Sequence, residues 1–148
     1  MSLHPPPTKS YHGQTVIVTG ANGCLGLETA RHPVALGAQK VILAVRSLDK
    51  GKAAKASIVE STDRADAASV IEVWQLDLSN YDSVIRFSER AKTLPRVDVI
   101  IENAAIVTLT FRMAGGDEST ITTNVISTFL LALLMLPKLW ETATRYGV

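Results

Sequence analysis

Apolar runs and amphipathic segments alternate four times along the chain. The runs are rich in β-branched residues and apolar nearly throughout, which is typical of parallel strands covered on both faces. The segments between them repeat apolar residues three and four positions apart, which favours helices that bury one face. The predicted strands are residues 14–19, 40–45, 70–76 and 97–101; the predicted helices run from the turn at 20–26 to about 36, from 48 to about 60, from 79 to 94, and from about 119 to 136.

Particular side chains mark the ends of these helices. Ser47 is placed to cap the second helix, and Ser79 with Asp82 has the spacing of a capping box before the third. Pro95 closes the third helix. Pro33 falls inside the first helix, where an interior proline costs about 3 kcal/mol, so we expect a kink or an early end there.

This order of elements predicts an α/β fold. Strands and helices that alternate with short connections favour parallel βαβ units, with helices on both faces of a doubly wound parallel sheet. Residues 62–68 and a loop through Gly115-Gly116 are predicted to be irregular connections. Residues 12–148 form the predicted domain, without a repeat or a second domain, and residues 1–11, with three consecutive prolines, form a predicted flexible Pro-rich tail.

Composition argues against several partners. The 148 residues are 47% hydrophobic, which suffices for one domain with a sizeable core. Fifteen basic residues oppose fourteen acidic ones without a basic cluster, so we expect no nucleic acid and no membrane as a partner. The most apolar run, residues 129–136, is far shorter than the ~18 residues of a membrane span. We predict no metal site.

Cysteine usage and the N-terminal residues bear on location. Cys24 is the only cysteine, so no internal disulfide can form. Residues 1–11 lack the apolar core of a signal peptide. We therefore expect a reducing, cytoplasmic location.

A glycine-rich turn follows the first predicted strand. Glycines tolerate positive φ and let the backbone approach a ligand, and the free N–H groups at a helix N-terminus attract a pyrophosphate. The turn therefore predicts dinucleotide binding. The candidate contacts in it are Gly20, Asn22, Gly23, Cys24, Leu25 and Gly26.

Together with later motifs, this turn resembles the short-chain dehydrogenase/reductase family, in a branch common among fungal metabolic enzymes. The motifs are Thr19-Gly20-Ala21-Asn22 with Leu25-Gly26, Arg46, Asp77-Leu78, Asn103-Ala104-Ala105 and Asn124. The resemblance covers about residues 12–140 and implies a Rossmann-like sheet, truncated after about four strands and the long final helix. It also implies that Asp77 contacts the adenine, that Asn103 lies near the cofactor ribose, and that Asn124 belongs to the catalytic tetrad.

Arg46 bears on the choice of cofactor. It lies about twenty residues beyond the glycines, where an acidic residue would accept the ribose hydroxyls of NAD and an arginine suits the 2′-phosphate of NADP. NADP(H) is therefore the predicted cofactor. Other roles stay open: Arg46 near Asp49 as an ordinary surface residue, Asp77 as a helix-entry cap, and Asn103 as a turn former at a strand end.

The chain also departs from the family. The family's later part supplies a serine and a Tyr-x-x-x-Lys pair, whose tyrosine exchanges a proton with the substrate oxygen. None of Tyr11, Tyr81 and Tyr146 has a lysine four positions on, and Asn124 is the one tetrad member present. Without a positioned acid, catalysis loses about 10²–10⁴-fold. The chain alone is therefore not expected to be a competent dehydrogenase.

Two substitutions touch the cofactor site itself. Cys24 stands where the family has its middle glycine, and Ala105 stands where the Asn-Ala-Gly motif has its glycine. Both add a side chain where backbone meets ligand, which puts cofactor binding in question. We expect Gly23 to restore some freedom to the turn. The thiol of Cys24 is expected to be buried and inert, with a reactive thiol as the alternative.

Three functions remain open from the sequence. The first is a truncated homologue that binds a small molecule or nucleotide, or catalyses a non-redox reaction such as cyclisation or isomerisation. The second is the N-terminal half of an NADP(H)-dependent oxidoreductase acting on a carbonyl or alcohol, recorded as a fragment or completed by a partner chain. The third is a regulatory or interaction subunit of a full-length homologue.

Two further expectations concern the site and the assembly. Catalytic groups would converge above the strand ends from Asn22, Glu102, Asn103, Asn124 and either His12 or Arg112. Loss of the family's fifth strand would expose strand 97–101 as an edge that pairs with another chain. In the family, the helix corresponding to 119–136 packs between subunits. We therefore predict a homodimer or higher oligomer, or half of a two-chain assembly.

Overall fold

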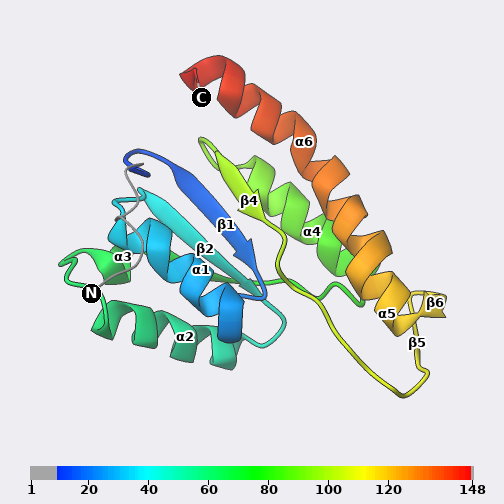
Figure 1. The fold of residues 1–148 in the computed structure, drawn as a ribbon. Helices are drawn as coiled ribbons and strands as arrows, with labels where there is room; N and C mark the ends of the chain where they lie inside the picture. The colour runs from blue at the N-terminus through cyan, green and yellow to red at the C-terminus, as the bar shows by residue number, and fades with distance from the viewer. Residues whose placement is uncertain (1–9, 148) are drawn as a thin grey trace, which may run out of the picture.

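A four-stranded parallel sheet forms the centre of the molecule. The computed structural model describes residues 10–147, drawn as a ribbon in Figure 1. The strands are β1 (Thr15–Thr19), β2 (Lys40–Val45), β3 (Ile71–Gln75) and β4 (Val99–Ile101), in the order β3-β2-β1-β4. Ile17 of β1 pairs in parallel with Ile42 of β2 and with Ile100 of β4. The predicted parallel α/β sheet is confirmed.

Helices cover both faces of the sheet. α1 (Cys24–Ala35) and α2 (Leu48–Glu60) lie on one face, and α4 (Tyr81–Lys92) and α6 (Ser127–Tyr146) lie on the other (Figure 1). Because strand side chains alternate between faces, Val16 and Val18 join the core beside α1 and α2, while Ile17 joins the core beside α4 and α6. Burial on both faces explains why β1 is apolar without alternation.

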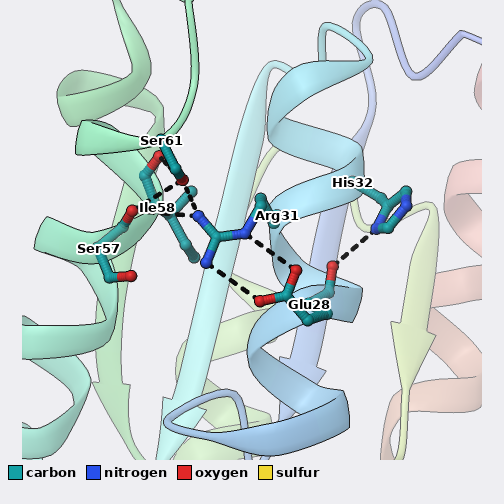
Figure 2. Close-up of polar contacts among 6 residues, drawn as sticks. All are labelled: Glu28, Arg31, His32, Ser57, Ile58 and Ser61. Carbon is teal, nitrogen blue, oxygen red and sulfur yellow. Dashed lines mark hydrogen bonds and ion pairs between the residues drawn. The ribbon is translucent and has the colours of Figure 1, made fainter.

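Arg31 ties the two helices on the first face together, as Figure 2 shows. Its guanidinium group donates to the carbonyl oxygen of Ser57 at 3.1 Å and to the hydroxyl of Ser61. Ser57 lies in the last turn of α2, and Ser61 is the C-cap residue that follows it. Glu28, one turn earlier in α1, holds Arg31 in an ion pair at 3.1 Å. These contacts fix α2 against α1.

Polar side chains cap the N-termini of α2 and α4. Ser47 caps α2 as predicted, because its hydroxyl accepts a backbone N–H from the first turn. At α4 the cap is Asn80 rather than Ser79: Oδ1 of Asn80 accepts the N–H of Ser83 at 3.1 Å. The N–H and hydroxyl of Ser79 instead donate to Asp77, at 2.9 and 2.6 Å.

Neither proline ends its helix at the predicted residue. α1 continues two residues beyond Pro33, so the predicted early end is wrong. Pro33 lies in the last turn of α1 with its ring buried. α4 ends at Lys92, two residues before the predicted end and three before Pro95.

Two predicted connections contain regular structure. A short helix, α3 (Ala67–Val70), precedes β3, so Val70 is helical and not the first residue of the strand. A small antiparallel hairpin, β5 (Met113–Ala114) and β6 (Asp117–Glu118), forms around the two glycines at 115 and 116, which both have positive φ. Both elements are too short to leave a periodic signal in the sequence.

The final helix is longer than predicted. α5 (Ser119–Ile121), the π-helical segment η1 (Thr122–Ile126) and α6 follow one another without a break, and α6 passes Pro137 to end at Tyr146 instead of residue 136. A buried contact explains the extension. The hydroxyl of Thr142 accepts the N–H of Val97 at 3.0 Å, which also withdraws Val97 from the predicted strand.

Within the described residues, one helical run passes a length and composition test for a membrane span. Residues Ser119–Tyr146 have a mean hydropathy of 1.7 over the most apolar window, and 33% of that window is buried in the molecule. Core helices of proteins without membrane spans pass the same test, so this is weak evidence.

The predicted tail falls almost entirely outside the described residues, which begin at residue 10. The N–H of Tyr11 donates to the carbonyl oxygen of Leu36 at 3.0 Å, and His12 forms an isolated antiparallel bridge with Ala38. Tyr11 also packs against the core. The domain therefore includes Tyr11, one residue before the predicted boundary.

Candidate functional site

A cavity of about 740 Å³ opens at the carboxyl ends of the strands. All twelve residues proposed as cofactor contacts line this cavity: Gly20, Asn22, Gly23, Cys24, Leu25, Gly26, Arg46, Asp77, Leu78, Asn103, Ala104 and Ala105. The loops that follow β1, β2, β3 and β4 supply them together with the first turn of α1, because the carboxyl ends of parallel strands meet at one edge of a sheet. The residues therefore share one site, and their contact with a cofactor stays a prediction.

Glycine is required at two positions of the turn after β1. Gly20 has φ +67, and a Cβ there would lie 2.9 Å from Cα of Ala104. A Cβ on Gly26 would overlap the carbonyl oxygen of Gly20 and lie 2.5 Å from Nδ2 of Asn103. The first turn of α1 therefore packs directly on the loop after β4.

Thr19 and Asn103 lock these two loops together. The hydroxyl oxygen of Thr19 accepts the N–H groups of Asn103 and Ala104, each at 3.0 Å. In return, Nδ2 of Asn103 donates to the carbonyl oxygen of Thr19 at 3.1 Å. Asn103 thus acts as the turn former that the sequence left open, while it also lines the cavity.

Cys24 differs from its predicted state. The side chain is exposed rather than buried, and it lines the cavity. Cys24 is also the one described non-glycine residue with positive φ, at 47°. Gly23 is extended, with φ −179°, so it does not relieve the turn as expected. The left-handed conformation that favours glycine falls on the position where this chain has cysteine.

Replacement of Cys24 by glycine is expected to raise the free energy of unfolding by about 1 kcal/mol. A Cβ in the left-handed region costs about 1–2 kcal/mol, and the extra chain entropy of glycine offsets part of that gain. Urea denaturation measures the change. Cys24→Ala keeps the Cβ and should show no comparable gain, so equal stabilisation by both variants would contradict the conformational explanation.

The charges around the cavity are unbalanced. Arg46, Lys50 and Arg112 line it, and within residues 10–147 none of the three has an ion-pair partner. Asp77 is the one carboxylate among the described lining residues. Lys50 was not among the predicted contacts, although the sequence places it one helical turn after Arg46. The cavity therefore carries an excess of positive charge.

The acidic neighbours of Arg46 have other partners. Asp49 lies 3.8 Å from the ammonium group of Lys52. Oδ1 of Asp77 accepts two hydrogen bonds from Ser79 in the loop before α4, and Asn80 rather than Asp77 caps that helix. Arg46 is exposed toward the cavity and free to meet a ligand.

Asn124 stands beside the cavity and holds part of its wall. It lies in η1, and π-helical turns occur frequently at functional sites. Its Oδ1 accepts the N–H of Ile106 at 2.9 Å, and its Nδ2 donates to the carbonyl oxygen of Ile106 at 2.8 Å. Ile106 lines the cavity, whereas Asn124 is not among its lining residues. Asn124 therefore positions the loop after β4.

The other candidate catalytic groups do not all converge. His12 bridges Ala38 at the start of β2, at the opposite edge of the sheet, so its predicted place in the site is wrong. None of the three tyrosines is among the described lining residues. Tyr81 lies 3.5 Å from a carboxylate oxygen of Asp117, and Tyr146 stacks under Arg96. Asn22 and Arg112 do line the cavity.

Glu102 follows β4 directly and is half-buried, but it does not line the cavity. Burial raises the pKa of its carboxyl from 4.5 to about 7. None of the hydrogen bonds or ion pairs found among the described side chains involves Glu102. Folding must therefore desolvate an ionised carboxylate at higher pH.

Glu102→Gln is expected to stabilise the protein above about pH 7 and to leave it unchanged below about pH 4.5. Between these values the folded chain keeps a proton that the unfolded chain has lost, so native stability falls as the pH rises. Partial exposure limits the size of the effect. Urea midpoints of both proteins across this range measure it. Glu60→Gln, at an exposed carboxylate, is the control, and parallel curves for native protein and Glu102→Gln would contradict the prediction.

The chain matches known proteins over nearly all of its length. A family model for short chain dehydrogenases matches residues 14–147. The short chain dehydrogenase/reductase dmxR8 of Cryptosporiopsis is 54% identical over 143 residues, 96% of this chain and 44% of the relative. The short chain dehydrogenase atnD of Emericella nidulans is 50% identical, over 93% of this chain and 43% of the relative. The chain thus spans less than half the length of these relatives.

Solved structures agree with the sequence matches. A metagenomic short-chain oxidoreductase in complex with NADP superposes with a TM-score of 0.72 and 27% identity, over 88% of this chain and 58% of that chain. The oxidoreductase yciK of Escherichia coli superposes with a TM-score of 0.72 and 26% identity, over 93% of this chain and 57% of that chain. The chain therefore belongs to the short-chain dehydrogenase/reductase family.

Proposed function

We propose that this chain binds NADP(H) as the nucleotide-binding part of an oxidoreductase that acts on a carbonyl or alcohol. The observation that carries the proposal is the pair Arg46 and Lys50, which line a cavity with one described carboxylate and have no ion-pair partner among residues 10–147. A pyrophosphate with a 2′-phosphate supplies the negative charge that such a cavity lacks. The NADP complex of a 27% identical short-chain oxidoreductase supports this choice of ligand.

Each part of the cavity suits one part of the cofactor. Arg46 and Lys50, at the end of β2 and in α2, would hold the 2′-phosphate. The glycine turn, with the N-terminus of the 12-residue α1, would hold the pyrophosphate. Leu78 is buried beside Asp77 and offers an apolar surface to the adenine.

The reaction class follows from the family and needs groups beyond those at this cavity. Reduction of a carbonyl moves a hydride from the nicotinamide to the carbon and a proton from an acid to the oxygen. No described tyrosine lines the cavity, so the acid would come from a Tyr-x-x-x-Lys segment that another part of the protein or a partner chain supplies. Co-expression with such a segment should give NADPH oxidation, and failure with every plausible segment would count against this role.

A second candidate is a small-molecule or nucleotide binder without redox chemistry, including a non-redox catalyst. The observation that favours it is Cys24, a side chain in left-handed conformation on the phosphate-binding turn. Exposed Ala105 adds a second side chain to the cavity wall. Under this hypothesis the turn has lost the close approach that the cofactor needs.

Calorimetry of NADPH binding to the purified chain separates the two candidates. Micromolar binding by the native chain would support the nucleotide-binding role. Absence of binding, with recovery in Cys24→Gly, would show that cysteine disables the turn and would favour the second candidate. Absence of binding in both proteins would contradict the proposed function.

Association with a second chain also stays a proposal. Within residues 10–147, β4 pairs only with β1 and leaves one strand edge open. The helix from 119 onward presents large apolar side chains to solvent, at Ile121, Val125, Phe129, Leu133, Leu136 and Trp140. Edge strands and apolar faces of this kind are commonly covered by another part of the protein or by a second subunit.

A further inference from the structure

Arg112 occupies a different part of the cavity from the other two cations. Arg46 and Lys50 come from the end of β2 and from α2, whereas Arg112 comes from the segment between β4 and β5. In the sheet, β1 separates β2 from β4, and Figure 1 shows the segment after β4 running toward α5. A 2′-phosphate held by Arg46 and Lys50 therefore leaves Arg112 without an anion.

The backbone at Arg112 is held in place. Its carbonyl oxygen accepts the N–H of Ser119 at 2.8 Å, at the start of α5. The next residue, Met113, pairs with Glu118 in the small hairpin. Arg112 is therefore attached to an ordered β5–β6 hairpin, and its position relative to the cavity does not depend on a free loop.

The carboxylates nearest in sequence are engaged elsewhere. Glu118 caps α5 by accepting the N–H groups of Thr120 and Ile121, at 2.9 and 3.1 Å, and these hydrogen bonds, that of Thr120 first, lower its pKa. Asp117 lies 3.5 Å from the hydroxyl of Tyr81. No ion pair of Arg112 exists in the described part of the chain. Its guanidinium group is therefore available to an anion from outside.

Arg112 has apolar and hydroxyl-bearing neighbours in the same part of the chain. Ile106, Met113 and Ala114 line the cavity, and so do Thr108, Ser119 and Thr123. A guanidinium group next to apolar side chains binds planar carboxylates well, because it forms two parallel hydrogen bonds with them and is itself only weakly hydrated.

We infer that Arg112 is a specificity-determining residue for an organic carboxylate with an apolar body. The inference rests on the proposed function, since it places this carboxylate in the substrate part of an NADP(H) site. Arg112 pairs with the carboxylate group of the substrate, and Ile106, Met113 and Ala114 contact its apolar part. Arg112 takes no part in the transfer of hydride or proton.

Phenylacetate and its neutral isostere phenylacetamide test this inference. Both are titrated by NMR into the chain saturated with NADP⁺ and into the chain without cofactor. We expect phenylacetate to bind at least about tenfold more tightly than phenylacetamide. Arg112→Met should abolish that preference, and Arg112→Lys should keep part of it. Arg145→Met removes an exposed charge from the far end of α6 and should change nothing.

The outcomes separate the inference from the proposed function. Equal binding of the two probes, or binding of neither, would overturn the inference even where NADPH binds. A roughly tenfold loss of NADPH affinity in Arg112→Met, without a carboxylate preference in the native chain, would assign Arg112 to the cofactor and also overturn it. If NADPH does not bind, the proposed function fails, and the comparison of the two probes in the chain without cofactor still decides the role of Arg112.

Discussion

Arg46→Ala is expected to weaken NADPH binding by about 10- to 100-fold and to leave NADH binding within about twofold of the native value. The two cofactors differ only by the 2′-phosphate, and a charge-assisted pair between a guanidinium group and a phosphate contributes about 1.5–3 kcal/mol. Arg46 lines the cavity, and no described carboxylate competes for it. Calorimetry with both cofactors measures the ratio.

Two further variants make this result specific. Lys50→Ala should lower NADPH affinity by a smaller factor, because an ammonium group meets phosphate as a point charge rather than through a fork of donors. Arg145→Ala removes the same charge from the C-terminal turn of α6 and should leave both affinities unchanged. An equal loss for NADPH and NADH in Arg46→Ala would show that Arg46 does not recognise the 2′-phosphate.

Gly26→Ala is expected to lower the free energy of unfolding by about 2–3 kcal/mol and to abolish NADPH binding. The new Cβ would overlap the carbonyl oxygen of Gly20 and lie 2.5 Å from Nδ2 of Asn103. Alanine gains up to about 1 kcal/mol over glycine within a helix, so a net loss requires the clash to exceed that gain. Thermal unfolding should show a fall in Tm of about 5–10 °C.

Gly23→Ala is the matched control on the same turn. Gly23 is extended, with φ −179°, and a Cβ there meets no described atom within 4 Å. Its stability should therefore stay within about 0.5 kcal/mol of the native value. If Gly26→Ala were as stable as Gly23→Ala, the contact between α1 and the loop after β4 would not be what requires glycine at position 26.

The fold was predictable because its signals are local and repeated. The apolar run of β1 predicts a strand from its own residues, and the hydroxyl of Ser47 predicts the start of α2 from the residues next to it. The errors lie where distant residues decide. The hydroxyl of Thr142, 45 residues away in the sequence, accepts the N–H of Val97, which shortens β4 and extends α6. No periodicity around residue 97 or 142 carries that information.

Most residues that line the cavity were predictable from the sequence, whereas their conformation and exposure were less so. The glycine turn, Arg46, Asp77 and Asn103 all line one cavity, as the order of the motifs indicated. Lys50 was missed because one lysine in a polar helix has no distinctive pattern. Cys24 was predicted to be buried because cysteine usually is, but the turn leaves it exposed with φ 47°.

The sequence by itself determined the order of strands and helices, the parallel sheet and the edge of the sheet at which the cavity opens. These features follow from apolar periodicity, helix caps and chain direction, which act over a few residues. Only the tertiary structure decided which charges share the cavity, because Arg46, Asp77 and Arg112 come from the segments after three different strands. Electrostatic pairing depends on distances in space, and for that reason the charge of the cavity emerges only from the folded chain.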